Sequence, residues 1–238
     1  MLEISGVTKI FGGLVAVDDV TFSLESEEIV GLIGPNGAGK TTLFNTITGV
    51  IPPDSGSVAF DGAQITGEKL SAICRRGIVR TFQIVRTFDE STVLENVQMG
   101  AIFGGSHATD AARRVAEEYI SFVGLAGKEH AEASSLTMAE RKHVELARGL
   151  ACEPKLLMLD EIGSGLTPAE IEALTETIER IRDELGVSIF WIEHVVEAIM
   201  ETTDRILVLN DGQLIAEGAP AEIRNDERVT KAYLGESG

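Results

Sequence analysis

The sequence of 238 residues has no long apolar run. No stretch reaches the roughly 18 consecutive apolar residues that cross a bilayer. Residues 1–6 also lack the basic and apolar regions of a secretory signal peptide. These two absences predict a cytoplasmic protein rather than a secreted or membrane-spanning one.

Cysteine is scarce, with two residues in the whole chain. Cys74 and Cys152 show no C-x-x-C spacing and are too few for a disulfide framework. We therefore interpret both as packing residues in a reducing compartment, in preference to a metal or redox site.

Basic residues are outnumbered, with 20 Lys and Arg against 38 Asp and Glu and a formal net charge of −18. Such a surface is poorly suited to holding nucleic acid phosphates or an anionic lipid leaflet through charge alone. We expect no nucleic acid partner. The acidic balance fits either an ordinary cytosolic protein or one that works in high salt.

Strand and helix patterns alternate along the chain, and there is no internal repeat. A chain of this length can bury a large core without disulfides or metals, and the alternation favours an α/β domain with a mainly parallel core. Strands are predicted at 2–4, 7–11, 16–24, 29–33, 57–60, 77–82, 156–159, 188–192, 205–210 and 213–217. Helices are predicted from near Lys40 and at 68–76, 93–99, 108–123, 138–151, 168–185, 195–201 and 219–234.

A glycine-rich loop at 34–42 reads Gly-Pro-Asn-Gly-Ala-Gly-Lys-Thr-Thr, between an apolar strand and a helix. Glycine lets successive backbone N–H groups turn inward around anionic oxygens, and the positive end of the helix dipole points at the same place. Lys40 can reach the β- and γ-phosphates, and the Thr41 hydroxyl can ligate Mg²⁺. We expect a nucleoside triphosphate here. A chance match in a turn is the alternative, which the flanking strand and helix argue against.

Two acidic residues, Asp160 and Glu161, end the apolar strand at 156–159. Parallel sheets present their ligands at this end of a strand. Asp160 can hold Mg²⁺ opposite Thr41, and Glu161 can polarise a water for in-line attack on the γ-phosphate. The alternative is a solvated pair that merely ends the strand.

With this loop and this acidic pair, the sequence closely resembles the ATP-binding cassette (ABC) ATPases. Residues 157–161, Leu-Met-Leu-Asp-Glu, resemble the family's Walker B strand with its catalytic glutamate. Gln83 falls where the family has its Q-loop, and His194 matches the switch histidine that contacts the γ-phosphate. Phe11 matches the aromatic residue that stacks on adenine.

The resemblance, together with the loop, defines one expected site for ATP and Mg²⁺. Its catalytic residues are Glu161, His194 and Gln83; its nucleotide-binding residues are Phe11, Gly34, Asn36, Gly37, Gly39, Lys40, Thr41, Thr42 and Thr137; and its metal ligands are Thr41, Gln83 and Asp160.

The segment at 136–140 resembles the family's signature sequence but departs from the usual LSGGQ. Thr137 keeps a hydroxyl, whereas Met138 and Ala139 replace the two glycines. Thr137 and Glu140 also satisfy an ordinary capping box, so a plain helix start is the alternative. Thr167 stands where the family's D-loop usually has Asp, and Ile162 replaces the proline that commonly follows the catalytic glutamate. These departures bear on dimer closure more than on ATP binding.

Within the family, nearly the whole chain resembles the importer ATPases for branched-chain amino acids and related amides, including the segments 11–17, 77–83 and 192–194 and the C-terminal tail. The resemblance implies a P-loop ABC ATPase fold over 1–238, with core and β subdomain in 1–84 and 153–238 and a helical subdomain at 85–152. It implies permease subunits and a second ATPase subunit as partners, an external solute-binding protein acting indirectly, and a place on the cytoplasmic face of the membrane.

Other functions are compatible with the sequence. The chain could be a regulatory subunit that binds ATP but hardly hydrolyses it, given Met138 and Ala139. A soluble ABC protein acting on DNA or ribosomes is disfavoured, because the sequence has one cassette, no long coiled coil and no basic face. A small-molecule kinase with the same loop would leave Asp160, Glu161 and His194 without their usual context.

Overall fold

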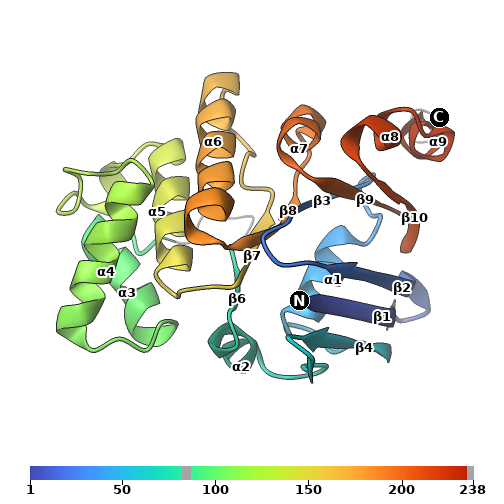
Figure 1. Cartoon of the computed structure of the whole chain (residues 1–238), viewed down its shortest axis with the longest axis horizontal. Helices are drawn as coiled ribbons and strands as arrows, with labels where there is room; N and C mark the ends of the chain where they lie inside the picture. The colour runs from blue at the N-terminus through green and yellow to red at the C-terminus, as the bar shows by residue number, and fades with distance from the viewer. Residues whose placement is uncertain (82–86, 235–238) are drawn as a thin grey trace. The chain divides into compact units, whose positions relative to one another are not determined.

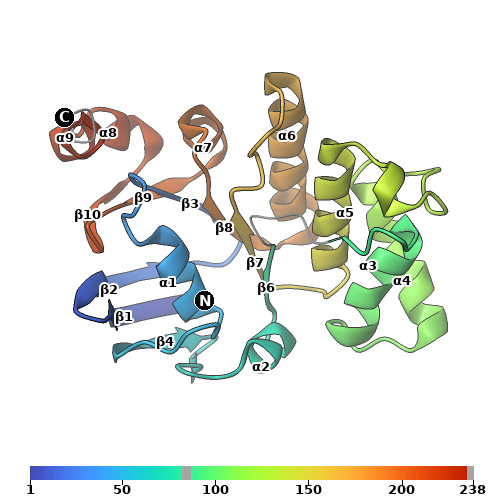
Figure 2. The same ribbon diagram turned by 180° about the vertical axis from the view of Figure 1, so that it is seen from behind.

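The computed structural model describes residues 1–81 and 87–234 and divides into two compact units. Unit 1 joins Met1–Ile73 to Ser188–Gly238, and unit 2 is Cys74–Val187. Figures 1 and 2 show the chain from opposite sides. The helical subdomain expected at 85–152 stays a prediction.

One sheet of unit 1 is antiparallel, in the order β2-β1-β4-β5. Its strands are β1 (Leu2–Phe11), β2 (Leu14–Leu24), β4 (Ser55–Phe60) and β5 (Ala63–Gln64). The two strands expected at 2–4 and 7–11 are a single strand, β1. Its pairing with β2 shifts between Ile4 and Val7, where Gly6 has φ of 58°, so a glycine bulge takes the place of the expected break.

The other strands of unit 1 run in the order β10-β9-β3-β8. They are β3 (Ile29–Ile33), β8 (Ser188–Ile192), β9 (Arg205–Asn210) and β10 (Gln213–Gly218). β3 pairs in parallel with β8 and β9, and β10 pairs antiparallel with β9. Every residue of β3 and β8 is buried, as expected for strands covered on both faces. The predicted parallel core is confirmed in these strands.

Helix α1 (Lys40–Ile47) ties the two sheets of unit 1 together. Its Phe44 ring lies 4.8 Å from the ring of Phe190 in β8, and Phe190 lies 5.6 Å from Phe22 in β2. Both views show α1 against the sheet of β1, β2 and β4 (Figures 1 and 2). The start of α1, where the glycine-rich loop ends, is therefore anchored to a rigid core.

The C-terminal helix expected at 219–234 is two helices, α8 (Pro220–Arg224) and α9 (Glu227–Leu234). The chain leaves the helical conformation at Asn225, and the Arg228 N–H donates to Asp226 Oδ1 at 2.7 Å. An aspartate that accepts from the first turn of a helix is a typical N-terminal cap, so α9 begins anew there. Helix α7 (Val196–Thr202) also lies in unit 1.

Unit 2 contains two short parallel strands, β6 (Ile78–Arg80) and β7 (Leu156–Asp160), which pair from Ile78 with Leu156 onward. Its helices are α3 (Val93–Phe103), α4 (Thr109–Phe122), the 3-10 turn η1 (Ala133–Ser135), α5 (Met138–Leu150) and α6 (Pro168–Leu185). Helix α2 (Leu70–Arg75) crosses from unit 1 into unit 2. Figure 1 shows α3, α4 and α5 packed side by side.

Candidate functional site

The glycine-rich loop begins where β3 ends, and two of its glycines lie against neighbouring backbone. Gly34 has φ of 153°, and a Cβ there would lie 2.0 Å from the carbonyl oxygen of Leu209 in β9. Gly39 has φ of 101°, and a Cβ there would lie 2.2 Å from the carbonyl oxygen of Ala16 in β2. Only glycine fits at either position, so the loop backbone is fixed by its two neighbouring strands.

Lys40 opens α1 and carries its ammonium group into the loop. The side chain is 5% exposed, and Nζ donates to the carbonyl oxygens of Gly34 at 2.6 Å and Pro35 at 2.9 Å. Gly39 at the cap position offers no side chain to the first N–H groups of the helix. These N–H groups, the helix dipole and the ammonium gather positive charge at one point, which suits phosphate oxygens. Thr41 and Thr42 lie in the same first turn.

His194 reaches the same edge of the sheet as the loop. Leu32 of β3 pairs with Ile192 of β8 in parallel, so Glu193 and His194 follow β8 at the level where the loop follows β3. Glu193 is 2% exposed, and its Oε1 accepts from the His194 N–H at 2.9 Å. The His194 side chain is exposed. Within unit 1 the fold therefore brings together the loop and the predicted switch histidine.

Phe11 lies at the end of β1 and is 47% exposed. Lys9 Nζ lies 5.4 Å from the centre of its ring, a cation–π distance. An exposed ring at a strand end has a free face for stacking, which is what the sequence prediction requires of this residue.

Asp160 ends β7 in unit 2 and is 2% exposed. Arg80 Nη2 lies 2.5 Å from Asp160 Oδ2, and both side chains are buried. Among the described residues, Asp160 Oδ1 is buried without a hydrogen-bond partner. A buried carboxylate oxygen in this position is an acceptor for a divalent cation or its water, so the residue fits the predicted Mg²⁺ ligand.

Glu161 follows at once and is 6% exposed. Its φ of 52° lies in the left-handed region, which a residue with a side chain rarely adopts. Strain of this kind costs about 1–3 kcal/mol and collects at functional sites. Because of this left-handed turn, the backbone at Glu161 leaves the direction of β7, which ends at Asp160.

Thr137 caps α5 with the capping box that the sequence allows. The Glu140 N–H donates to Thr137 Oγ1 at 3.3 Å, and the Thr137 N–H donates to Glu140 Oε2 at 2.9 Å. Lys128 forms an ion pair with Glu140, and the hydrogen bonds to Glu140 hold the pKa of its carboxyl below the usual range. Met138 is 54% exposed. The hydroxyl expected to act in a partner's site is thus also part of a local cap.

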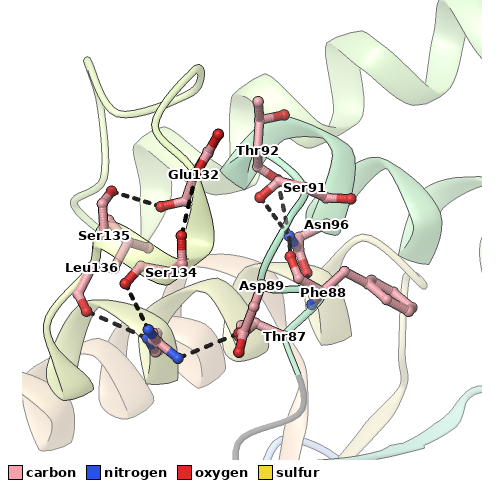
Figure 3. A network of polar contacts seen from close by, with 11 residues as sticks. Thr87, Phe88, Asp89, Ser91, Thr92, Asn96, Glu132, Ser134, Ser135 and Leu136 are labelled. Atoms are coloured by element: carbon pink, nitrogen blue, oxygen red, sulfur yellow. Dashed lines mark hydrogen bonds and ion pairs between the residues drawn. The ribbon is translucent and has the colours of Figure 1, made fainter.

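A polar network fixes the chain in front of α5 to the segment that leads into α3 (Figure 3). Arg141 donates to the carbonyl oxygens of Leu136 at 3.3 Å and Ser134 at 2.8 Å and forms an ion pair with Asp89 at 3.3 Å. Asn96 is fully buried, and its amide group accepts from Phe88 N–H and donates to Phe88 O. Arg141 therefore links the chain in front of α5 to Asp89, and Asn96 holds the neighbouring Phe88 against the start of α3.

The sequence did not point to two polar residues that lie at the site, Arg80 and Glu193. Arg80 is a charged residue inside an apolar strand, which is the signal that could have pointed to a buried partner. Its partner Asp160 lies 80 residues away in the sequence, so local patterns could not name it. Gln83, predicted as a catalytic residue and metal ligand, lies outside the described residues.

The comparisons with known proteins agree with these features. The family model described as "ABC transporter" matches residues 17–164, and the model described as "Branched-chain amino acid ATP-binding cassette transporter" matches residues 213–238. The high-affinity branched-chain amino acid transport ATP-binding proteins LivG of Salmonella typhimurium and BraF of Pseudomonas aeruginosa are 40% and 39% identical, each over 100% of this chain and 98% of its own length.

Among solved structures, the ADP conformation of MJ1267, an ATP-binding cassette of an ABC transporter, superposes with a TM-score of 0.90 at 30% identity. The match covers 99% of this chain and 98% of that one. Among the residues that the structure describes, no helix combines the length and apolar character needed to cross a bilayer. With its P-loop fold and its full-length relatives, the chain belongs to the ATP-binding cassette (ABC) transporter family, as an ATPase of that family.

Proposed function

We propose that this chain binds and hydrolyses ATP as the motor subunit of an importer for branched-chain amino acids or related amides. The observation that carries ATP binding is the loop after β3, in which close backbone contacts require Gly34 and Gly39 and the buried Lys40 ammonium faces the loop carbonyls. The import role and solute class are supported by the printed names of LivG and BraF and by the match of the C-terminal tail.

Each site residue has a proposed role. Lys40 and the N-terminus of α1 bind the phosphate oxygens and stabilise the charge that develops during transfer. Phe11 stacks on the adenine, and Asn36, Gly37 and Thr42 complete the loop. Thr41 and Asp160 are the ligands for Mg²⁺, with Gln83 proposed from the sequence alone; the ion supplies charge neutralisation at the phosphates when it is bound.

Glu161 is the proposed general base. Its carboxylate accepts a proton from the water that attacks the γ-phosphorus in line, and His194 holds the γ-phosphate in position. Its left-handed backbone and low exposure favour one fixed direction for the carboxylate. A positioned base contributes about 10²–10⁴-fold to a rate.

The proposed working unit is a pair of ATPase subunits, each loop being closed by the partner subunit's signature segment, with a permease docked on the pair. Thr137, at the start of α5, supplies the hydroxyl for this contact. The pair sits peripherally on the cytoplasmic face of the membrane through the permease, and the external solute-binding protein acts through the permease.

A test of the motor role is Glu161→Gln. We expect ATP to induce dimers of this variant, seen by light scattering, while phosphate release falls by about 10²–10⁴-fold. The control Lys40→Ala should lose the ATP-induced dimer, because the phosphates lose their main cation. Full ATPase activity in Glu161→Gln would remove Glu161 from its role.

A regulatory subunit with weak hydrolysis is the second candidate, and the exposed Met138 at the start of α5 favours it. Here the double change Met138→Gly and Ala139→Gly should raise turnover with the permease several-fold, since it opens the helix start to a partner's nucleotide. If the native chain already turns over ATP rapidly with its permease and the glycines change nothing, the motor reading stands and this one fails.

A further inference from the structure

The ends of β6 and β7 lie side by side in unit 2, and contacts from β6 hold Asp160 at the end of β7. Arg80 of β6 lies opposite Met158 of β7 in the parallel ladder. One residue on, the Thr81 N–H donates to the Met158 carbonyl oxygen at 3.0 Å, and Thr81 Oγ1 accepts from the Asp160 N–H at 3.3 Å. The backbone at Asp160 is therefore fixed before its side chain is considered.

The Asp160 carboxylate is paired with the guanidinium group of Arg80. Arg80 Nη2 donates to Asp160 Oδ2 at 2.5 Å, and the two side chains are 4% and 2% exposed. A buried ion pair is costly to break, because removal of one partner leaves the other charge without water or a counterion. The pair is thus a fixed part of unit 2 and not a surface contact that opens and closes freely.

The two oxygen atoms of this carboxylate differ. Oδ2 accepts from Arg80, whereas Oδ1 is buried and has no hydrogen-bond partner within residues 1–81 and 87–234. Buried polar atoms are nearly always paired, so an unpaired carboxylate oxygen is a candidate ligand atom for a cation. Rotation of the carboxylate would exchange the two oxygens, and the contact with Arg80 opposes that rotation. Arg80 therefore determines which oxygen stays open.

We propose that Arg80 is a positioning residue for metal binding: it holds Asp160 through Oδ2 and so leaves Oδ1 as the atom that accepts Mg²⁺. The inference rests on the proposed function, in which Asp160 is a metal ligand. Arg80 itself does not bind the cation, because two positive charges repel each other. It acts as an outer partner of the ligand, and partners of this kind fix the direction of the group that binds the metal.

A positive charge beside the ligand has a second effect, of opposite sign. It offsets part of the negative charge of Asp160, which by itself would weaken the attraction for a divalent cation. Loss of the Arg80 contact therefore weakens metal binding if orientation dominates and strengthens it if charge dominates. Orientation should dominate here, because a buried carboxylate that lost its partner would turn toward another donor or toward water.

The test measures Mn²⁺ in place of Mg²⁺ by electron paramagnetic resonance, in titrations of the full chain with saturating ATP. Arg80→Lys keeps the charge but not the planar guanidinium, and we expect it to raise the Kd for Mn²⁺ by about tenfold, the lower end of the effect of such outer partners. Binding of ATP in EDTA should stay within about twofold of the native value, because the variant leaves the loop and Lys40 intact. An unchanged or lower Kd for Mn²⁺ overturns the proposal.

A matched control is Thr81→Val, which removes the side-chain bond to the Asp160 N–H and leaves the carboxylate paired with Arg80. It should lower the free energy of unfolding in urea, while the Kd for Mn²⁺ changes by less than about twofold. An equal rise of the Kd in Thr81→Val would mean that any loosening of this strand end has the same effect, which also contradicts the proposal.

Asp160→Asn separates this inference from the proposed function. If Asp160 is the ligand, Asp160→Asn alone raises the Kd for Mn²⁺, and adding Arg80→Lys raises it by no more than about twofold further. Independent effects in the double variant contradict an action through Asp160. A native Kd in Asp160→Asn removes Asp160 from the proposed metal site and overturns this inference with it. A raised Kd in Asp160→Asn with a native Kd in Arg80→Lys overturns the role of Arg80 alone.

Discussion

Gly39 lies where the loop turns into α1, and two physical effects exclude a side chain there. The left-handed φ of 101° costs an alanine about 1–2 kcal/mol, and the Ala16 carbonyl oxygen 2.2 Å from its Cβ adds a clash of about 1–3 kcal/mol. We predict that Gly39→Ala lowers the free energy of unfolding by about 3 kcal/mol and abolishes ATP binding, as measured by urea unfolding and nucleotide titration.

Gly37 offers a matched control in the same loop. Its φ is 78°, but nothing lies within 4 Å of a Cβ built there. Gly37→Ala should therefore cost only the backbone strain, about 1–2 kcal/mol. Equal losses in the two variants would mean that the contact with Ala16 contributes nothing to the shape of the loop.

At the level of single residues, the site divides into parts that local sequence can and cannot predict. The loop residues Gly34 to Thr42 are recognisable because their spacing is set by one short stretch of backbone. The ion pair of Arg80 with Asp160 joins two residues whose nearness depends on the pairing of β6 with β7.

Among the elements, α6 was predicted with its observed bounds, 168–185, because Thr167, Pro168 and Glu170 mark its start and Gly186 ends it in the left-handed conformation. The single helix expected at 219–234 was wrong, because the polar run 224–228 contains Asp226, whose side chain accepts from the Arg228 N–H and starts a new helix. A polar run on a helix surface does not show by its composition alone whether the backbone continues or breaks.

Helix α5 provides a prediction about its cap. Thr137, just before α5, and Thr92, just before α3, each form a capping box with the glutamate three residues later. Replacing either by alanine should cost about 1 kcal/mol of unfolding free energy. If Thr137 also acts on a partner's nucleotide, only Thr137→Ala should lower ATP-induced dimerisation and turnover, by about tenfold. Thr137→Ser keeps the hydroxyl and should therefore keep both dimerisation and turnover at the native level. Equal losses of dimerisation and turnover in Thr92→Ala would show that Thr137 acts only as a helix cap.

The same helix carries His143, whose burial lowers its pKa below 6.5, against an opposing hydrogen bond to the Ala139 carbonyl oxygen and the charge of Glu140. Below pH 6.5 the unfolded chain binds this proton more readily than the folded one. The free energy of unfolding should therefore fall as pH drops from 7 toward 5.5, by less than about 1.4 kcal/mol per unit.

His143→Gln should flatten this slope, measured as the difference between the urea unfolding curves of variant and native chain at each pH. The difference isolates His143 from the carboxylates, whose lowered pKa values place their own effects at more acidic pH. A slope that survives the substitution assigns the pH dependence to another group.

The charge of the whole molecule, −18, acts on its stability as mutual repulsion among carboxylates that the compact state brings close. Raising the salt concentration from 0.1 to 1 M shortens the screening length from about 10 to about 3 Å, so most of this repulsion disappears. We predict that the thermal midpoint rises by several degrees in 1 M KCl, since about 1 kcal/mol corresponds to roughly 2–4 °C in a chain of this size.

The triple variant Glu118→Gln, Glu172→Gln and Glu176→Gln neutralises three exposed carboxylates, and its thermal midpoint should rise less in the same salt. An equal gain in both proteins would assign the effect to salt acting on apolar surface, and a midpoint that falls with salt would show that the ion pairs of the fold outweigh its net charge.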